Sequence, residues 1–514
     1  MAADTQQDVV AYLMEPSTHH GARVERIDTH GAIVFLAGSR ALKLKRAVRY
    51  DYLDFSSEPL RRTACEAEVR INRRSAPSLY RGVVAVTREG DGSLALNGRG
   101  TPVDWVVDMA RFDQEALFDR LAARGALGLE LMRPLASAIA RFHEGAEPRD
   151  DHGGRAGMAW VVTGNADGFA EQGAGVLDPT RCAELTFAAR VELERVDAML
   201  EARRRHGFVR QCHGDLHLRN LVLLEGQPTL FDAIEFNDEI ACIDVLYDLA
   251  FLIMDLWRRR LERHASVVFN GYLAETHDVS GLALLPLFLS CRAAVRAKTS
   301  ATAARLQRDP SSARELQDLA RGYLLMAVEF LRPPPARLIA VGGFSGSGKS
   351  TLARALAPGI GRVPGAVVVR SDEMRKALLG VPPLQRLGAE GYTPEVTARV
   401  YQEVARMAAD VLQAGQSAVV DAVFARPADR FAIEQVATAA AAPFLGFWLE
   451  AEPHVLATRA EAREADASDA GAAVVSRQVV QDPGPISWNR LDATATPDVV
   501  AERASRLADA HLVQ

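Results

Sequence analysis

Hydrophobic and polar residues change their spacing along this chain. Residues 31–48 (GAIVFLAGSRALKLKRAV) have the pattern of a strand, a turn at Gly38-Ser39 and a second strand. Residues 81–100 predict another hairpin, and residues 62–76 between the two have the spacing of a helix. From about residue 114 to residue 330 the pattern is mostly helical. This order predicts a small β-rich lobe followed by a larger helical lobe.

The pattern breaks at three consecutive prolines, Pro333–Pro335. They cannot lie inside a helix and they favour a stiff, extended connector. After them, the apolar strand RLIAVGGF begins a series of strands and helical segments that is typical of an α/β domain with a parallel sheet. We therefore predict two domains, residues 1–332 and residues 337–514, with a linker at residues 333–336. The predicted fold class is mixed α/β and α+β.

The composition is that of a globular protein. Of the 514 residues, 48% are apolar and 25% are charged, and the net charge of −6 argues against extended nucleic-acid binding. The five cysteines form no CxxC pair, so we expect reduced thiols. Neither a signal peptide nor a membrane-length apolar run is visible, so we expect a cytoplasmic protein. Residues 245–257 (VLYDLAFLIMDLW) predict a buried helix, and the arginines at residues 203–205 predict a solvated helix face.

A polar motif, HGDLHLRN (residues 213–220), precedes a predicted hairpin, LVLLEGQPTLF, that ends just before Asp232. Because a hairpin brings its two ends together, Asp215, Asn220 and Asp232 should converge at one edge. Amide and carboxylate oxygens suit Mg²⁺ on nucleotide phosphates, and Asp215 can accept a proton from an incoming hydroxyl. This arrangement predicts phosphoryl transfer. His143 and His217 fit packing roles better than substrate contacts.

A lysine for the nucleotide phosphates is available upstream. The strand ALKLK places Lys43 and Lys45 on one face, and either can reach the phosphates. The following helix offers Glu66 and Glu68 as partners for that lysine. These glutamates are two positions apart and point in different directions, so only one faces inward. We favour Glu68 as the inward glutamate and Lys43 as the ATP-binding lysine.

The motifs HGDLHLRN, LFDAIEF and IDVLYDLAFL resemble those of the aminoglycoside phosphotransferase and choline kinase family, over about residues 25–330. The resemblance implies a protein-kinase-like bilobal fold, with Asp215 as the catalytic base and with Asn220 and Asp232 as magnesium ligands. It also implies that His213 braces the catalytic loop and that Asp248 holds it. The first strands lack GxGxxG, and neither Phe-Gly nor an APE motif follows Asp232. The resemblance is therefore to small-molecule kinases.

A second phosphate-binding signature lies in the other half. Residues 343–351 (GFSGSGKST) match GxxxxGK[ST] between an apolar strand and the helix TLARALA. In this context backbone N–H groups and the helix N-terminus hold phosphate oxygens. Lys349 would reach the β and γ phosphates, and Ser350 would bind Mg²⁺. The predicted nucleotide-binding residues of the loop are Gly343, Ser345, Gly346, Ser347, Gly348, Lys349, Ser350 and Thr351.

This half resembles the P-loop group of small-molecule and polynucleotide kinases, with its zeta-toxin-like and AAA-type ATP-binding domains, over about residues 337–514. In that group the aspartate after the second strand, here Asp372, orients the accepting hydroxyl. The resemblance also implies that Arg375 contacts the substrate and that Asp421 lies near Mg²⁺. Because Ala422 follows this aspartate where a remodelling ATPase has a glutamate, that class is disfavoured.

Two arginines in this half have two interpretations. The resemblance implies that Arg459 and Arg463 form a lid that closes on the triphosphate. The same spacing also fits an ordinary helix face paired with Glu461 or Glu464. We favour the lid.

Together the motifs predict a bifunctional enzyme that uses ATP and Mg²⁺. The arrangement resembles bacterial bifunctional proteins that fuse an aminoglycoside phosphotransferase to a predicted kinase. Each domain would transfer the γ-phosphate to a hydroxyl of a small molecule, or of a nucleic-acid end for the second domain. The alternative is one active kinase domain joined to a P-loop domain that binds nucleotide and regulates. The sequence identifies neither acceptor nor the oligomeric state.

Overall fold

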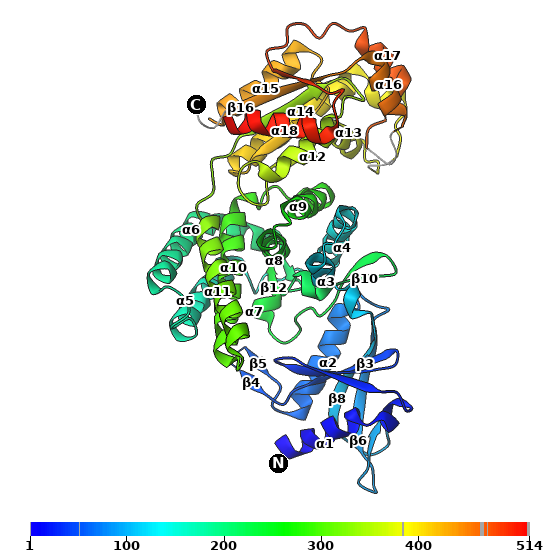
Figure 1. Ribbon diagram of the computed structural model, residues 1–514, viewed down its shortest axis with the longest axis vertical. Helices are drawn as coiled ribbons and strands as arrows, with labels where there is room; N and C mark the ends of the chain where they lie inside the picture. Colours follow the sequence, from blue (N-terminus) through cyan, green and yellow to red (C-terminus); the bar gives the residue numbers. More distant parts are fainter. Residues whose placement is uncertain (1, 51, 383–384, 463–466, 470, 511–514) are drawn as a thin grey trace. The chain divides into compact units, whose positions relative to one another are not determined.

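The computed structural model describes residues 2–50, 52–382, 385–462, 467–469 and 471–510. The chain divides into two compact units: unit 1, Met1–Arg258 with Cys291–Arg321, and unit 2, Arg259–Ser290 with Gly322–Gln514. The division does not follow the predicted linker, because helix α9 (Glu262–Thr276) belongs to unit 2. The independent folding of pieces separated at residues 333–336 stays a prediction. Figure 1 shows the elements of both units.

Unit 1 begins with an antiparallel sheet in the order β1-β2-β3-β8-β6-β7. Both predicted hairpins are present, and Gly38 supplies the positive φ of +56° that the β2–β3 turn needs. A short hairpin of β4 and β5 follows β3. The strands are β1 Val24–Asp28, β2 Ala32–Ala37, β3 Arg40–Lys45, β4 Arg49–Tyr50, β5 Leu53–Asp54, β6 Tyr80–Arg88, β7 Leu94–Leu96 and β8 Thr101–Ala110.

Helices cover both faces of this sheet. On one face α1 (Ala2–Met14) buries Val9 and Leu13 among the apolar side chains of the strands. On the other face α2 (Glu58–Asn72) buries Cys65 and Val69. Its position beside β3 and β8 brings the inner side of α2 to the lysines of β3.

The rest of unit 1 is mainly helical, as the sequence predicts. Helix α8 is buried along nearly its whole length, including Asp248 and Asp255. The prediction for residues 203–205 is wrong for Arg203, because its guanidinium is buried and paired with Asp244 at 2.7 Å. The helices are α3 Phe118–Ala123, α4 Met132–Glu144, α5 Gly154–Glu171, α6 Pro179–Arg205, α7 Asp238–Ala241 and α8 Val245–Arg258, with 3-10 turns at Pro16–His19, Gln114–Ala116, Leu129–Leu131 and Leu218–Asn220.

The hairpin predicted before Asp232 is confirmed. Strands β10 (Leu221–Leu224) and β11 (Gln227–Leu230) pair antiparallel. Glu225 and Gly226 join them with φ values of +49° and +77°, the two positive values that a tight type I′ turn requires. A second pair, β9 (Val209–Gln211) with β12 (Cys242–Asp244), supports the start of the HGDLHLRN segment.

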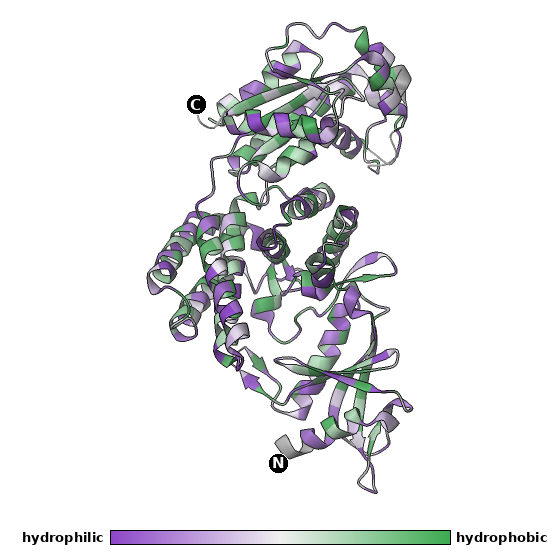
Figure 2. Ribbon diagram, in the orientation of Figure 1, coloured by the Kyte–Doolittle hydropathy of each residue, from purple (hydrophilic) through white to green (hydrophobic). Residues whose placement is uncertain are grey.

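Unit 2 contains a parallel sheet of five strands in the order β14-β15-β13-β16-β17. Figure 2 shows hydrophobic residues along these strands, and every residue of β13 is buried. With the antiparallel sheet of unit 1, this sheet confirms the predicted fold class. The strands are β13 Leu338–Gly343, β14 Val367–Arg370, β15 Ala418–Asp421, β16 Phe444–Glu450 and β17 Asn489–Asp492.

Helices α12 and α18 bury Leu352, Leu356 and Val500 in the core of this sheet. Helices α10 and α11 contribute residues to both units. The helices are α10 Leu285–Leu306, α11 Pro310–Phe330, α12 Lys349–Leu356, α13 Ser371–Leu378, α14 Pro394–Gln413, α15 Pro427–Ala439, α16 Pro453–Glu461, α17 Ala472–Val479 and α18 Pro497–Ala510, with 3-10 turns at Leu282–Leu284, Ala357–Gly359 and Ala389–Tyr392.

Helix α9 closes the exposed edge of the parallel sheet. The side-chain amide of Asn270 accepts from the N–H of Val368 at 2.8 Å and donates to the carbonyl of Ala366 at 3.2 Å. Strand β14 is an edge strand, and this pair of bonds satisfies backbone groups that would otherwise lack a strand partner.

The remaining expectations concern thiols and membranes. All five cysteines are buried and free, in agreement with the reduced thiols that the sequence predicts. Among the helices that the structure describes, none is long and apolar enough to cross a membrane.

Candidate active sites

The first site in unit 1 forms around Lys43 on β3. Its ammonium group lies 2.8 Å from Oε1 of Glu68 and also contacts the carboxylate of Asp232. Glu68 is fully buried, whereas Glu66 pairs with Arg62 on the surface. Burial disfavours the charged form of Lys43, but Asp232 and Glu68 outweigh it and raise the pKa of Lys43 well above its usual value. A lysine held in this way stays cationic for phosphate.

A second lysine enters the same network. Lys45 contacts both Glu68 and Glu235, and both lysines lie on the face of β3 that α2 covers. The two lysines lie two positions apart on the same strand face, so the strand pattern alone did not separate their roles. Lys45 and Glu235 each have side chains that are only 3% exposed, so this ion pair is closed to solvent, while Asp232 is 42% exposed and open to a ligand.

The predicted base and a predicted metal ligand contact each other. The side-chain amide of Asn220 donates to Oδ2 of Asp215 at 3.0 Å and to its backbone carbonyl at 2.9 Å. This fixes the amide so that its own oxygen is available for a cation. Burial by itself would raise the pKa of the Asp215 carboxyl, but His217, His213 and Arg296 together hold that pKa below its usual range.

His217 has a larger part in this site than the sequence suggested. Its Nε2 lies 3.3 Å from Oδ2 of Asp215, and its Nδ1 accepts the N–H of Arg219 at 3.3 Å. Because Nδ1 acts as acceptor, the proton belongs on Nε2, which faces Asp215. The signal in the sequence was the position of this histidine two residues after the aspartate in HGDLHLRN.

The HGDLHLRN segment is held by Asp248 on α8. Its two carboxylate oxygens accept the N–H groups of His213 at 3.0 Å and Gly214 at 2.9 Å. The side chain of His143 lies 3.1 Å from the same carboxylate. The ring of His213 contacts the carbonyl of Phe231 at 2.9 Å, and this contact ties the loop to the end of β11.

Asp232 has an unusual backbone conformation that neighbouring side chains hold. Its φ is +61°, in the left-handed region that costs a non-glycine residue about 1–3 kcal/mol. Its N–H donates to the hydroxyl of Tyr80 at 3.1 Å, and the next N–H, of Ala233, donates to Oδ1 of Asn72 at 2.8 Å. Tyr80 and Asn72 are buried and come from β6 and α2. The sequence showed no signal for either contact, which joins residues about 150 positions apart.

Removing the Tyr80 hydroxyl should therefore weaken magnesium–nucleotide binding. In Tyr80→Phe the N–H of Asp232 loses its buried acceptor, a loss of about 1–3 kcal/mol. We expect an affinity about tenfold lower, measured by calorimetric titration of Mg²⁺-ATP into protein whose second site is inactivated by Lys349→Ala. Tyr12→Phe, on α1 at the other face of the sheet, is the control. An unchanged affinity in Tyr80→Phe would contradict this role.

The second site lies at the P-loop of unit 2. Gly346 and Gly348 have φ values of +83° and +91°, which only glycine adopts without strain. A side chain at Gly346 would collide with the carbonyl of Leu456, whereas the space beside Gly348 is open. The buried hydroxyl of Ser347 has no hydrogen-bond partner among the described residues. An open cradle with an unsatisfied donor fits a phosphate group.

The predicted magnesium residues of this site converge on an arginine. The guanidinium of Arg370, at the end of β14, donates to the hydroxyl of Ser350 at 3.0 Å and to Asp421 at 3.2 Å. It also pairs with Glu373 at 2.8 Å. The sequence did not single out Arg370. Lys349 donates to the carbonyl of Phe344 within its own loop at 3.1 Å.

The two predicted acceptor-side residues have different surroundings. Asp372 lies in the first turn of helix α13, and burial, together with Asp421, raises its pKa. Arg375 donates to the carbonyl of Gly391 at 2.7 Å and lies over the ring of Tyr392. Its Nε has no hydrogen-bond partner among the described residues. Gly391 and Tyr392 thus hold Arg375 in place, and its predicted contact with an acceptor stays a prediction.

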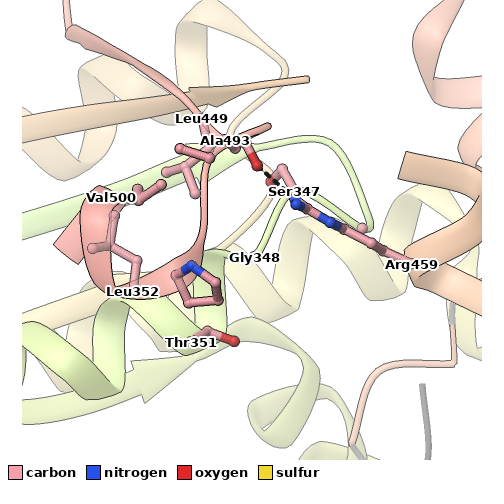
Figure 3. Close-up of a pocket in the computed structure, with 11 residues that line it drawn as sticks. Ser347, Gly348, Thr351, Leu352, Leu449, Arg459, Ala493 and Val500 are labelled. Atoms are coloured by element: carbon pink, nitrogen blue, oxygen red, sulfur yellow. Dashed lines mark hydrogen bonds between the residues drawn. The ribbon is translucent and has the colours of Figure 1, made fainter. Parts of the chain in front are cut away.

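A pocket of about 220 Å³ adjoins the P-loop (Figure 3). Arg459 crosses it and donates to the carbonyl of Ala493 at 2.6 Å. Of the two predicted lid arginines, Arg459 is therefore at the loop, while Arg463 lies outside the described residues. The other lining residues are Gly346, Ser347, Gly348, Thr351, Leu352, Leu449, Ala495, Pro497 and Val500.

Comparison with known proteins supports the predicted domain type of each half. Residues 84–282 match the model of the phosphotransferase enzyme family, and residues 338–481 match an AAA domain. Uncharacterized proteins of Mycobacterium tuberculosis and Mycobacterium bovis are 30% identical over 486 residues, which cover 91% of this chain and 92% of each relative. The chain belongs to the family of these mycobacterial proteins. As its motifs predicted, this family member joins a phosphotransferase-type domain to a P-loop, kinase-like domain, and both domain types support phosphotransferase activity.

Solved structures are similar to parts of this chain. A choline/ethanolamine kinase family protein from Mesorhizobium loti is 12% identical, with 64% of this chain and 95% of that chain covered and a TM-score of 0.36. A gluconokinase from Sinorhizobium meliloti 1021 is 21% identical, with 35% and 97% covered and a TM-score of 0.26.

Proposed function

We propose that the protein is a bifunctional phosphotransferase in which each domain transfers the γ-phosphate of ATP to a hydroxyl group. For the first domain the proposal rests on the convergence of Lys43, Asp215, Asn220 and Asp232. Lys43 would hold nucleotide phosphates, and Asn220 and Asp232 would hold Mg²⁺, which neutralises phosphate charge when bound. Asp215 would orient the hydroxyl of the acceptor and take its proton.

In the second domain the P-loop would hold the triphosphate and Asp372 would orient the acceptor. Support comes from the open cradle at Gly348, from the neighbouring pocket, and from the hydroxyl of Ser347, which has no hydrogen-bond partner in the described part of the chain. The Nε donor of Arg375 fits a polar acceptor, such as a small molecule or a nucleic-acid end.

The acceptor of the first domain need not be a polycation such as an aminoglycoside. An aminoglycoside would need free carboxylates, and the acidic segment after Asp232 has already paired several of its own. Glu235 contacts Lys45, Asp244 pairs with Arg203, and Asp238 lies 3.1 Å from Arg149. Sugars and amino alcohols are therefore supported equally well as acceptors.

One observation favours the alternative, in which the P-loop domain binds nucleotide and regulates. Arg370 places a guanidinium between Ser350 and Asp421, the two residues expected at the metal. Nucleotide with Mg²⁺ would have to displace this contact before transfer. A domain that only binds nucleotide would not need to do so.

A phosphate-transfer screen tests these functions. The protein, Asp215→Ala and Lys349→Ala would each be incubated with labelled ATP, Mg²⁺ and a panel of aminoglycosides, sugars, amino alcohols, nucleosides and nucleic-acid ends. We expect each variant to lose a different set of acceptors. Transfer by Lys349→Ala alone, with none by Asp215→Ala, would support the regulatory alternative for the P-loop domain. No transfer by the unmodified protein would contradict both.

A further inference from the structure

A short segment, Ala467–Asp469, is anchored at the acceptor side of the P-loop site. The carboxylate of Asp469 accepts from the ammonium of Lys376 at 3.0 Å, the N–H of Leu387 at 3.0 Å and the hydroxyl of Tyr392 at 2.9 Å. Lys376 is 1% exposed, so this ion pair is shielded from solvent and salt. Three donors from α13 and from the chain between α13 and α14 thus fix the position of Asp469.

This anchor places the preceding side chain at the predicted acceptor carboxylate. The side chain of Ser468 hydrogen-bonds the carboxylate of Asp372, and Lys349 acts on the same carboxylate electrostatically. An acceptor hydroxyl in a kinase makes this bond to its orienting carboxylate. Ser468 therefore presents a primary hydroxyl where an acceptor would present its own.

We propose that Ser468 is a self-phosphorylation site of the P-loop domain. The proposal rests on the kinase function proposed above for that domain. Oγ of Ser468 would form a bond to the γ-phosphorus of ATP as the bond from that phosphorus to the β,γ-bridging oxygen breaks. ADP leaves with the electron pair, and the proton of the hydroxyl passes to Asp372.

The modification would change the site that produced it. A phosphoserine carries about −1.5 to −2 charges at pH 7. On Ser468 it would stand beside the carboxylate of Asp372, and like-charge repulsion would free Asp372 from this residue. Self-phosphorylation would then open the carboxylate to an external acceptor.

The test uses the full chain with the first site silenced by Asp215→Ala. This protein would be incubated with Mg²⁺ and γ-labelled ATP without acceptor, and the labelled residue identified by mass spectrometry. We expect label on Ser468. In Ser468→Ala the label should fall about tenfold, a rate change of about 1.4 kcal/mol in the barrier. In Ser468→Thr we expect phosphothreonine at the same position. Ser476→Ala, an exposed serine on α17, should keep the label.

ADP formation by the same samples separates the two ways of failing. Label on another residue would contradict self-phosphorylation at Ser468 and leave the kinase function intact. The same conclusion would follow if no label appears although ADP is formed or an added acceptor is phosphorylated. If no label appears and ADP forms only as slowly as in the Asp215→Ala, Lys349→Ala double variant, the result contradicts both self-phosphorylation and the kinase function of the P-loop domain.

Discussion

Asp215→Asn is expected to lower phosphate transfer by the first domain by about 10²–10⁴, the usual contribution of a positioned acid–base group. Oδ2 of Asp215 is occupied by Asn220 at 3.0 Å and by His217 at 3.3 Å, and we assign Oδ1 to the acceptor hydroxyl. An amide at this position cannot take the proton. The affinity for nucleotide should stay nearly unchanged, because Asp215 is not among the residues assigned to phosphate or metal.

The measurement is the transfer rate to the best acceptor found in the screen, in protein carrying Lys349→Ala. Asp232→Asn should instead weaken magnesium–nucleotide binding, since its carboxylate is 42% exposed and lies beside Lys43. Asp318→Asn, a solvated aspartate on α11, is the control and should change neither quantity. Equal losses of nucleotide affinity in Asp215→Asn and Asp232→Asn would refute the separate roles.

Asp372→Ala should abolish most transfer by the second domain, again by about 10²–10⁴, without a matching loss of nucleotide affinity. Asp372 lies in the first turn of α13, whereas the groups assigned to phosphate lie in the P-loop and at the start of α12. Removal of this carboxylate takes away the group that orients the hydroxyl and leaves the phosphate cradle in place.

Here the background is Asp215→Ala, so that all remaining transfer comes from the P-loop domain. Nucleotide affinity and transfer rate would be measured on the same preparation. Asp410→Asn, whose carboxylate pairs with Arg406 on the surface of α14, serves as the matched control. If Asp372→Ala binds nucleotide as poorly as Lys349→Ala, Asp372 supports the nucleotide rather than the acceptor.

Short-range geometry explains what could be predicted about these sites. Gly226 favours the positive φ that a tight turn needs, so the convergence of Asn220 and Asp232 followed from the hairpin. The P-loop likewise needs only glycines at two positive φ values between a strand and a helix, all within a few residues. The family comparisons confirm both domain types.

Contacts between distant segments could not be predicted in this way. Neither Tyr80 nor Asn72 carries a mark that pairs it with residues 232 and 233, and Lys43 and Lys45 are equivalent in the strand pattern. Both contact Glu68 of α2, and only their second partners distinguish them, Asp232 for Lys43 and Glu235 for Lys45. The prediction for Arg203 failed for the same reason, because its partner Asp244 lies 41 positions away.

The sequence by itself determined the two domain types, the local elements and the residue types of both sites, because these depend on backbone preferences and side-chain spacing over a few positions. Tertiary structure alone decided which groups meet: Arg370 with Ser350 and Asp421, Ser468 with Asp372, and α9 with the edge of β14. Buried polar groups must find partners within hydrogen-bond distance, and those partners come from whichever segments the folded core brings together.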